Sequence, residues 1–187
     1  EDGEEENLPK LYIKAVNPGY KIDGVNNVGE MIEIARVGDP DTPISLAGIA
    51  VRYTNSSGNS SILFEFPEHS LMTGETLLLR LASSPESELA AVNYTKTLAY
   101  KGGIDLMVDN EKVDSVCWMG KDECYKDFKS ANPTVLVRNL EMDGFEHIGV
   151  TEYEPVYNSE SYVVEASKDE EGYGQVASQC RGLQFSE

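Results

Sequence analysis

Short β-type segments separated by turn signals constrain the fold of this chain more than any other feature. They follow one another from residue 11 to residue 118, at intervals of roughly ten residues. In residues 11–16 (Leu-Tyr-Ile-Lys-Ala-Val) the side chains at 11, 13 and 15 are apolar, which predicts a strand with one inward face. Several such segments in succession predict an all-β protein, and their spacing favours a β-sandwich.

Two further segments are predicted to be strands. Residues 30–36 (Glu-Met-Ile-Glu-Ile-Ala-Arg) are apolar through their centre, with charges at both ends. Residues 76–81 (Thr-Leu-Leu-Leu-Arg-Leu) form a nearly continuous apolar run, which predicts a strand buried on both faces. Helix signals are weak, and helical turns are expected only at residues 85–91 and 122–128.

Two hairpins are predicted from turn chemistry. Residues 49–53 and 61–66 are the arms of the first, joined by the polar loop 55–60 (Asn-Ser-Ser-Gly-Asn-Ser). Residues 104–108 and 113–116 are the arms of the second, joined by a polar turn that contains Asp and Asn.

The charge of the chain excludes some classes of partner. Among 187 residues, 15 are Lys or Arg and 33 are Asp or Glu, which gives a net charge of −18. This negative field repels phosphate backbones, so direct nucleic-acid binding is not expected, whereas cationic partners and divalent cations are compatible with it. No apolar run reaches about 18 residues, so membrane insertion is not expected.

The composition divides the chain into unequal parts. Residues 1–9 are predicted to be a disordered acidic leader, and residues 10–140 to be the β-sandwich domain. Residues 141–179 form an acidic extension, in which Tyr153, Tyr157 and Tyr162 are interspersed among the acids. Two interpretations of it stay open: a loosely packed, solvated connector, or a binding segment in which tyrosines supply contact area and acids steer the partner.

The chain has three cysteines, Cys117, Cys124 and Cys180. Six residues separate the first two, and a disulfide between them is expected in an oxidising compartment, with a stabilisation of roughly 2–3 kcal/mol. A free thiol at Cys124 would be a liability in its charged, exposed-looking surroundings. Cys180 is left to pair with one of these or with another chain segment, and three free thiols in a cytosolic protein is the alternative.

No catalytic constellation is visible. There is no Gly-x-Ser-x-Gly elbow and no phosphate-binding glycine loop. His69 is predicted to lie in a loop and His147 to be a surface or capping residue, and no Cys or His spacing supports zinc. The chain is therefore predicted not to be an enzyme.

No cofactor is predicted, and calcium is the metal alternative that stays open. Acidic side chains cluster at residues 39–41 and 105–111, where they offer oxygen ligands in loops. Neither cluster has the spacing of an EF-hand, and solvated acidic turns explain both without a metal.

The order of the β segments is similar to that of a known domain. Its fragments are residues 13–18 (Ile-Lys-Ala-Val-Asn-Pro), 29–34 (Gly-Glu-Met-Ile-Glu-Ile), 44–49 (Ile-Ser-Leu-Ala-Gly-Ile), 64–67 (Phe-Glu-Phe-Pro), 71–75 (Leu-Met-Thr-Gly-Glu), 103–106, 113–116 and 136–138. In this order they resemble the strands and turns of the lamin tail domain, a family found in nuclear lamins and in exported bacterial proteins. The resemblance implies an immunoglobulin-like β-sandwich of the lamin tail type, followed by a less regular acidic extension.

Two positions depart from the family pattern, Ile49 where Trp is usual and Thr73 where Pro is common. Both are core or turn positions, so the expected fold is unchanged. The short polar loops, negative charge and cysteines are similar to the exported bacterial type. Residues 180–187 resemble the beginning of a first strand of the same type, so a second such domain downstream is a further hypothesis.

The resemblance implies a non-catalytic module of an exported bacterial cell-surface protein, which adheres to a protein or glycan partner or presents other domains. The expected contact residues are Asn55, Asn59, Tyr153, Tyr157 and Tyr162. Two alternatives stay open, an accessory domain that targets an attached secreted hydrolase or nuclease, and an intracellular scaffold. The neighbouring domains of the parent protein would identify an accessory targeting domain. The redox state of the cysteines would identify an intracellular scaffold.

Overall fold

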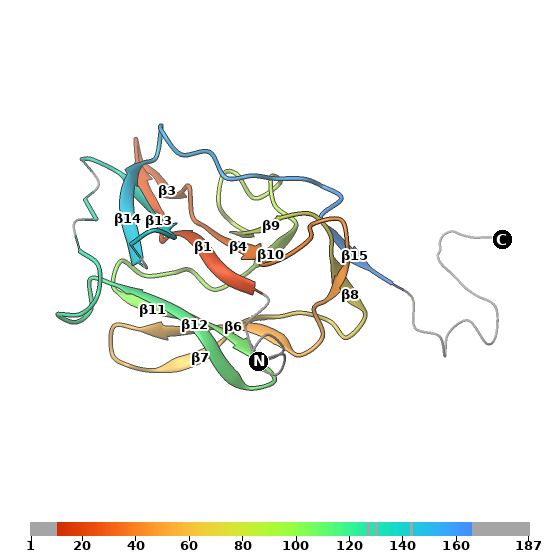
Figure 1. Cartoon of the computed structure of the whole chain (residues 1–187). Coiled ribbons are helices and arrows are strands. Elements are labelled where there is room, and N and C mark those ends of the chain that lie inside the picture. The colour runs from red at the N-terminus through yellow and green to blue at the C-terminus, as the bar shows by residue number, and fades with distance from the viewer. Residues whose placement is uncertain (1–10, 127, 130, 143, 166–187) are drawn as a thin grey trace.

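The computed structural model of the chain describes residues 11–126, 128–129, 131–142 and 144–165 (Figure 1). The protein is all-β, with several sheets, and none of these residues is helical. They therefore contain no helix long and apolar enough to cross a membrane. Four predictions lie outside the described residues: the leader 1–9, the end of the extension 166–179, the start of a second domain 180–187, and the pairing of Cys180.

The strands form four sheets. The strands are β1 (Leu11–Asn17), β2 (Tyr20–Ile22), β3 (Val25–Val28), β4 (Met31–Arg36), β5 (Ile44–Ser45), β6 (Ile49–Asn55), β7 (Ser60–Glu65), β8 (Ser70–Met72), β9 (Thr76–Leu81), β10 (Val92–Tyr94), β11 (Gly102–Val108), β12 (Glu111–Trp118), β13 (Thr134–Asn139), β14 (Gly144–Gly149) and β15 (Tyr162–Val164). A six-stranded sheet has the order β10-β9-β4-β1-β13-β14, and a four-stranded sheet the order β12-β11-β6-β7. A three-stranded sheet (β15-β8-β5) and the hairpin β2-β3 complete the fold.

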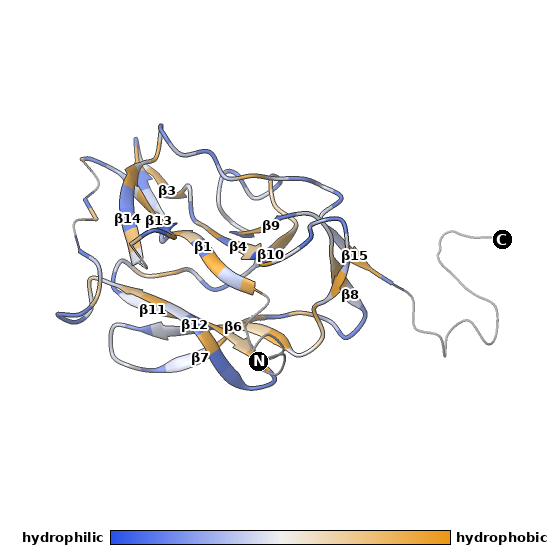
Figure 2. Ribbon diagram, in the orientation of Figure 1, coloured by the Kyte–Doolittle hydropathy of each residue, from blue (hydrophilic) through white to orange (hydrophobic). Residues whose placement is uncertain are grey.

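One hydrophobic core receives side chains from both larger sheets. Ile13 and Ile32 of the six-stranded sheet belong to the same buried cluster as Ile104 and Trp118 of the four-stranded sheet, which lies below it in Figure 1. Figure 2 shows apolar residues concentrated in strands of both sheets. Trp118 is fully buried, and its indole N–H donates to the carbonyl oxygen of Ala99 at 2.8 Å, which satisfies the polar atom that it buries.

The six-stranded sheet is covered on its second face as well. A smaller buried cluster lies there, formed by Ala15, Met31, Leu78 and Val135. Val150 and Tyr153, which follow β14, pack against it. Because both faces are covered, β4 and β9 are buried along their whole length. The prediction that residues 76–81 form a strand buried on both faces is confirmed.

A β-bulge in β1 changes the predicted alternation. The pairing of β1 with β4 shifts register between Ile13 and Ala15. Leu11 and Ile13 face the main core, but Ala15 belongs to the smaller cluster and Val16 to the main core. The expectation that residues 11, 13 and 15 share one inward face is therefore wrong at Ala15, because the extra residue of a bulge inverts the alternation beyond it.

Both predicted hairpins are confirmed. β6 pairs antiparallel with β7, and β11 pairs antiparallel with β12. In the second hairpin Asp109 and Asn110 adopt φ angles of 51° and 69°. A two-residue type I′ turn requires this left-handed conformation at both positions, and Asp and Asn tolerate it better than most residues.

No helical turn forms at residues 85–91, nor in the described part of residues 122–128, so that prediction is wrong. In the first segment the guanidinium of Arg80 donates to the carbonyl oxygen of Leu89 at 3.2 Å, so an acceptor of the turn serves a neighbouring strand instead. In the second segment Tyr125 forms an isolated bridge with the end of β12, which holds the chain extended. Tertiary contacts override weak local helix signals in both places.

The sheets continue beyond the predicted domain boundary at residue 140. β14 pairs with β13, and β15 pairs with β8. Between these strands the hydroxyl of Tyr153 donates to Glu33 Oε1 at 2.5 Å. In Figure 1 this segment runs along the upper side of the molecule from β14 to β15. The described part of the acidic extension is therefore built into the fold, rather than being a loosely packed connector.

Candidate functional site

A groove of about 310 Å³ lies on the face of the four-stranded sheet that is turned away from the main core. β11 and β12 form its floor. The loop after β6 and the loop after β12 form its walls. Cys117 and Cys124 both line it, and we call it the disulfide groove.

The floor of the disulfide groove is bare backbone at the start of β11. A Cβ atom at Gly103 would lie 2.9 Å from the Cβ of Cys117, and one at Gly102 would lie 2.7 Å from the carbonyl oxygen of Thr54. Neither position has room for a side chain. Around this floor lie uncharged polar side chains, among them Thr54 and Ser115, and the rim carries both acids and lysines. This lining suits a ligand that offers hydrogen-bonding groups rather than a large net charge.

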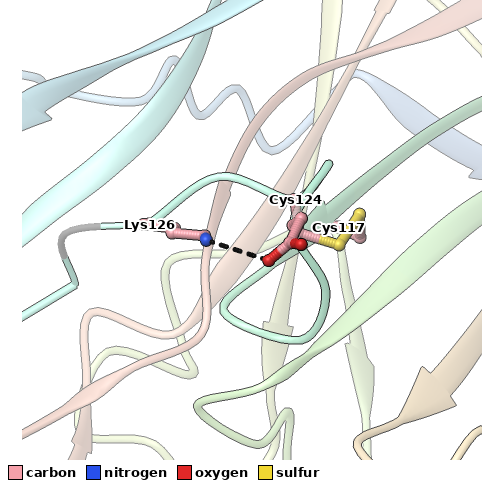
Figure 3. The surroundings of a disulfide bond; sticks show 4 residues. Cys117, Cys124 and Lys126 are labelled. Atoms are coloured by element: carbon pink, nitrogen blue, oxygen red, sulfur yellow. Dashed lines mark ion pairs between the residues drawn. A yellow bond between two sulfur atoms is a disulfide. The ribbon is translucent and has the colours of Figure 1, made fainter.

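The predicted disulfide between Cys117 and Cys124 is present (Figure 3). The S–S distance is 2.05 Å and the Cα atoms are 4.9 Å apart. The loop between them is also closed by the backbone, because the N–H of Tyr125 donates to the carbonyl oxygen of Cys117 at 3.0 Å. The ion pair marked in Figure 3, from Lys126 Nζ to an oxygen of Asp122 at 3.6 Å, is solvent-exposed and contributes little. The covalent bond therefore does most to hold this wall of the groove in place.

We expect the double substitution Cys117→Ser, Cys124→Ser to lower the free energy of unfolding by about 2 kcal/mol, because the bridge closes a short loop in the unfolded chain. Urea unfolding without reductant measures the loss. Dithiothreitol should lower the free energy of unfolding of the native protein by a similar amount, and it should leave that of the double variant unchanged. A native protein whose stability is indifferent to dithiothreitol would contradict the bridge.

The two predicted contact asparagines lie on the loop that walls the groove. Asn55 lines the groove, and its side-chain oxygen accepts hydrogen bonds from the backbone N–H groups of Ser57 and Asn59, both at 3.0 Å. Asn55 therefore also closes its own loop. Asn59 is exposed but does not line the groove. A contact role for either residue stays a prediction.

The three predicted contact tyrosines lie away from the disulfide groove. Tyr153 is half-buried against the six-stranded sheet, and Tyr162, on β15, packs with its ring centroid 5.9 Å from that of Phe66. Tyr157 is the most exposed of the three, with 37% of its surface accessible. The five predicted contact residues therefore do not form one surface, and only the asparagines adjoin the groove.

The carboxylates that suggested calcium have partners within the protein. Asp39 accepts a hydrogen bond from the backbone N–H of Asp41 at 2.9 Å, and Asp105 accepts two from the guanidinium of Arg52, at 2.8 and 3.0 Å. Across the described ranges, no group of three or more His, Cys, Asp or Glu side chains is placed to hold a metal ion.

A second hollow, which we did not predict, lies beside the hairpin β2-β3. Its volume is about 420 Å³. Gly19 and Tyr20 line it from the start of the hairpin, and Thr97, Leu98 and Tyr100 line it from the loop before β11. We call it the hairpin hollow.

A fully buried carboxylate, that of Glu30, lies behind the wall of the hairpin hollow. Its Oε2 accepts hydrogen bonds from the hydroxyl of Tyr94 at 3.1 Å and from the backbone N–H of Leu98 at 2.9 Å. Its Oε1 is buried and has no hydrogen-bond partner among the described residues. The available signal was an acid at the start of the apolar segment 30–36, which we took for a charged strand end.

Burial raises the pKa of Glu30 from its ordinary 4.5 to about 7, although the hydrogen bonds from Leu98 and Tyr94 act in the opposite direction. Between these two pH values the folded protein binds more protons at this site than the unfolded chain does. The contribution of Glu30 to stability is therefore greatest at low pH and is lost as the pH rises through about 7.

We expect Glu30→Gln to flatten the pH dependence of stability. Between pH 6 and pH 8 the native protein should lose about 1 kcal/mol more than the variant, because only the native protein must ionise this buried site. Urea unfolding of both proteins across this range measures the difference. All other side chains are common to the two proteins, so their effect cancels, and parallel curves would contradict the raised pKa.

No model of a known protein family matches the chain, and a search of curated proteins finds no match either. The resemblance to lamin tail domains is therefore a hypothesis carried by the fragments named above. The two hollows are described from the geometry of this chain alone.

Proposed function

We propose that this chain is a non-catalytic module of an exported cell-surface protein, with an immunoglobulin-like β-sandwich of the lamin tail type, and that it binds a protein or glycan partner through the disulfide groove. The observation that carries the proposal is the position of the loop with Asn55 opposite the bridge between Cys117 and Cys124. Sequence patterns pointed to the loop and the bridge separately, and both adjoin one groove.

The chemistry of the groove supports binding of a neutral, hydrogen-bonding ligand. The hydroxyl groups around its floor suit sugar hydroxyls or the polar groups of an extended peptide. Asp105, the acid in the floor, is paired with Arg52, which favours binding over acid–base chemistry. The same groove would serve the alternative role, in which the domain targets an attached enzyme to its substrate.

The disulfide supports the proposed location. Disulfides persist in oxidising compartments and are rare where glutathione and thioredoxin keep thiols reduced. The bond between Cys117 and Cys124 is therefore more compatible with an exported module than with an intracellular scaffold.

The groove is tested by blocking it. Ser115→Arg would place a long side chain over the floor, since Ser115 is exposed and lines the groove. Ser57→Arg is the matched control, because Ser57 is an exposed serine on the adjacent loop that does not line the groove. Ligands are first identified by probing a glycan array and an array of extracellular proteins with the native chain.

A ligand bound at the groove should bind the Ser57→Arg protein like the native one and the Ser115→Arg protein at least tenfold more weakly. Both variants add the same charge, so a general electrostatic effect would weaken both equally. Equal binding by the two variants would place the contact surface elsewhere, and no ligand on either array would count against an adhesive role.

A further inference from the structure

Glu30 is a buried acid without a cation. Four ion pairs join side chains of the described residues, and Glu30 takes part in none of them. A carboxylate removed from water is costly unless a charge or several hydrogen bonds compensate it. Two donors serve Oε2, and no group among the described residues serves Oε1. This arrangement leaves an acceptor that a ligand could use.

Gly19, which lines the hairpin hollow, lies next to Oε1 of Glu30. Gly19 has a φ angle of 92°, and a Cβ atom there would lie 3.1 Å from Oε1. The hairpin β2-β3 pairs only with itself. Tyr20 ties the start of the hairpin to the main core, and its hydroxyl donates to the carbonyl oxygen of Thr134. The neighbouring Gly19 has no side chain in that core, so the backbone can adjust locally at this position. A small movement at Gly19 would bring the carboxylate into contact with a ligand in the hollow.

Aromatic side chains line the hairpin hollow from both sides, Tyr20 from the hairpin and Tyr100 from the loop before β11. The rings of Tyr20 and Tyr100 meet edge to face, with their centroids 5.9 Å apart. The hydroxyl of Tyr100 is buried and, like Oε1, has no hydrogen-bond partner among the described residues. An ammonium group offers three donors and is attracted to aromatic ring faces. The hollow therefore combines a negative charge, a free hydroxyl oxygen and aromatic walls.

We propose that the hairpin hollow binds a primary alkylammonium group, the side chain of a lysine on a protein partner, with Glu30 as the buried counter-charge. This site is separate from the disulfide groove. A divalent metal fits less well, because it requires several oxygen ligands, and the described residues place no group of three acidic, His or Cys side chains together. The net charge of −18 favours the approach of a cationic partner.

The test uses two small probes that differ in the ammonium group. N-acetyl-lysine methylamide carries it, and N-acetyl-norleucine methylamide has a similar apolar chain without it. Each is titrated into isotopically labelled native protein at pH 8 and followed by the amide signals of Gly19 and Leu98. The lysine probe should shift both signals in a saturable manner at millimolar concentration, and the norleucine probe should not.

Two variants with a matched control assign the binding to Glu30. Glu30→Gln should weaken the binding of the lysine probe at least tenfold. Asp23→Asn removes an equal charge from the adjacent hairpin β2-β3, but Asp23 does not line the hollow, so binding should stay within twofold of native. Asn26→Lys adds a positive charge to the lining of the hollow at an exposed position. It should weaken the binding of the lysine probe without affecting folding.

The outcomes separate clearly. Equal shifts with both probes would show an unselective apolar hollow, and no shift with either would show that the hollow binds no such group. Loss of binding in Asp23→Asn equal to that in Glu30→Gln would reduce the effect to net charge. Each of these results overturns the proposal. If Glu30→Gln does not fold, undiminished binding by Asn26→Lys overturns it.

Discussion

Replacing Arg138 with Met should lower the free energy of unfolding by about 3–5 kcal/mol, because it leaves a largely buried carboxylate without its cation. Arg138 Nη2 donates to Asp114 Oδ2 at 2.5 Å, and its Nε donates to the carbonyl oxygen of Ile13 at 2.8 Å. The N–H of Ile13 in turn donates to Asp114 Oδ2 at 2.7 Å. The pair thus satisfies both backbone groups of Ile13, next to the bulge in β1.

The position of this pair explains the size of the effect. Asp114 lies on β12 and Arg138 on β13, so the pair joins the two larger sheets. Their side chains are only 16% and 13% exposed, so solvent screens them little. The guanidinium also lies 4.6 Å from the ring centroid of Phe145 and 5.5 Å from that of Tyr12. Met keeps an apolar chain between these rings, so the variant isolates the loss of charge and hydrogen bonds.

Urea unfolding measures the loss, and Arg52→Met is the matched control. Arg52 pairs with Asp105 at 2.8 Å within the four-stranded sheet, and Asp105 is as buried as Asp114, but the Arg52 side chain is 35% exposed. Among the described residues its guanidinium donates only to Asp105, whereas that of Arg138 also donates to a backbone carbonyl oxygen. Solvent screening should limit the loss in this control to about 1 kcal/mol. Similar losses in the two variants would mean that the pair of Arg138 and Asp114 has no special role between the sheets.

Replacing Glu33 with Ala should cost about 3 kcal/mol and release the segment after β14, because two donors lose their acceptor. Glu33 is fully buried on β4. It accepts hydrogen bonds from the hydroxyl of Tyr153 at 2.5 Å and from the backbone N–H of Val156 at 3.1 Å. Lys14 Nζ lies 3.9 Å away, at the limit of an ion pair. One carboxylate therefore fastens the acidic extension to the six-stranded sheet.

Stability and local opening are measured separately. Urea unfolding gives the global loss of stability, and limited digestion with a glutamate-specific protease reports the accessibility of the bond after Glu152, which joins it to Tyr153, one of the two residues that donate to Glu33. Cleavage there should be faster in Glu33→Ala than in the native protein, and Tyr153→Phe should show about half the loss in stability. Glu146→Ala, at an exposed position of β14, is the control and should leave both properties unchanged. Unaltered cleavage in Glu33→Ala would contradict the anchoring role.

Patterns confined to neighbouring residues predicted the strands and hairpins well. The pairing of residues 49–53 with 61–66 and the buried strand 76–81 are both confirmed. Each depends on turn chemistry or side-chain alternation within a few residues, so the sequence carries the information locally. The helical turns expected at residues 85–91 failed because backbone groups there bond to the neighbouring strands. The N–H of Ala91 donates to Leu78 of β9, and the carbonyl oxygen of Ser87 accepts from Asn93 of β10.

The candidate site was predictable only in part. The bridge of Cys117 with Cys124 follows from a short separation in the chain, and it is confirmed. That the loop of Asn55 lies across a groove from it depends on the sheet order, in which β6 and β12 both flank β11. Tyr153, a predicted contact residue, is half-buried. Its hydroxyl donates to Glu33, which lies 120 residues earlier in the chain, so no local pattern could predict this position.

The sequence by itself determined the strands predicted from alternation, the two hairpins and the disulfide, because short-range alternation, turn residues and loop length decide these features. Only the tertiary structure decided which acids lie inside. Glu30, Glu33 and Asp114 resemble the many solvated acids of a chain with net charge −18, yet all three serve partners far along the chain. Burial and pairing depend on which strands become neighbours, and no local pattern of charge encodes that arrangement.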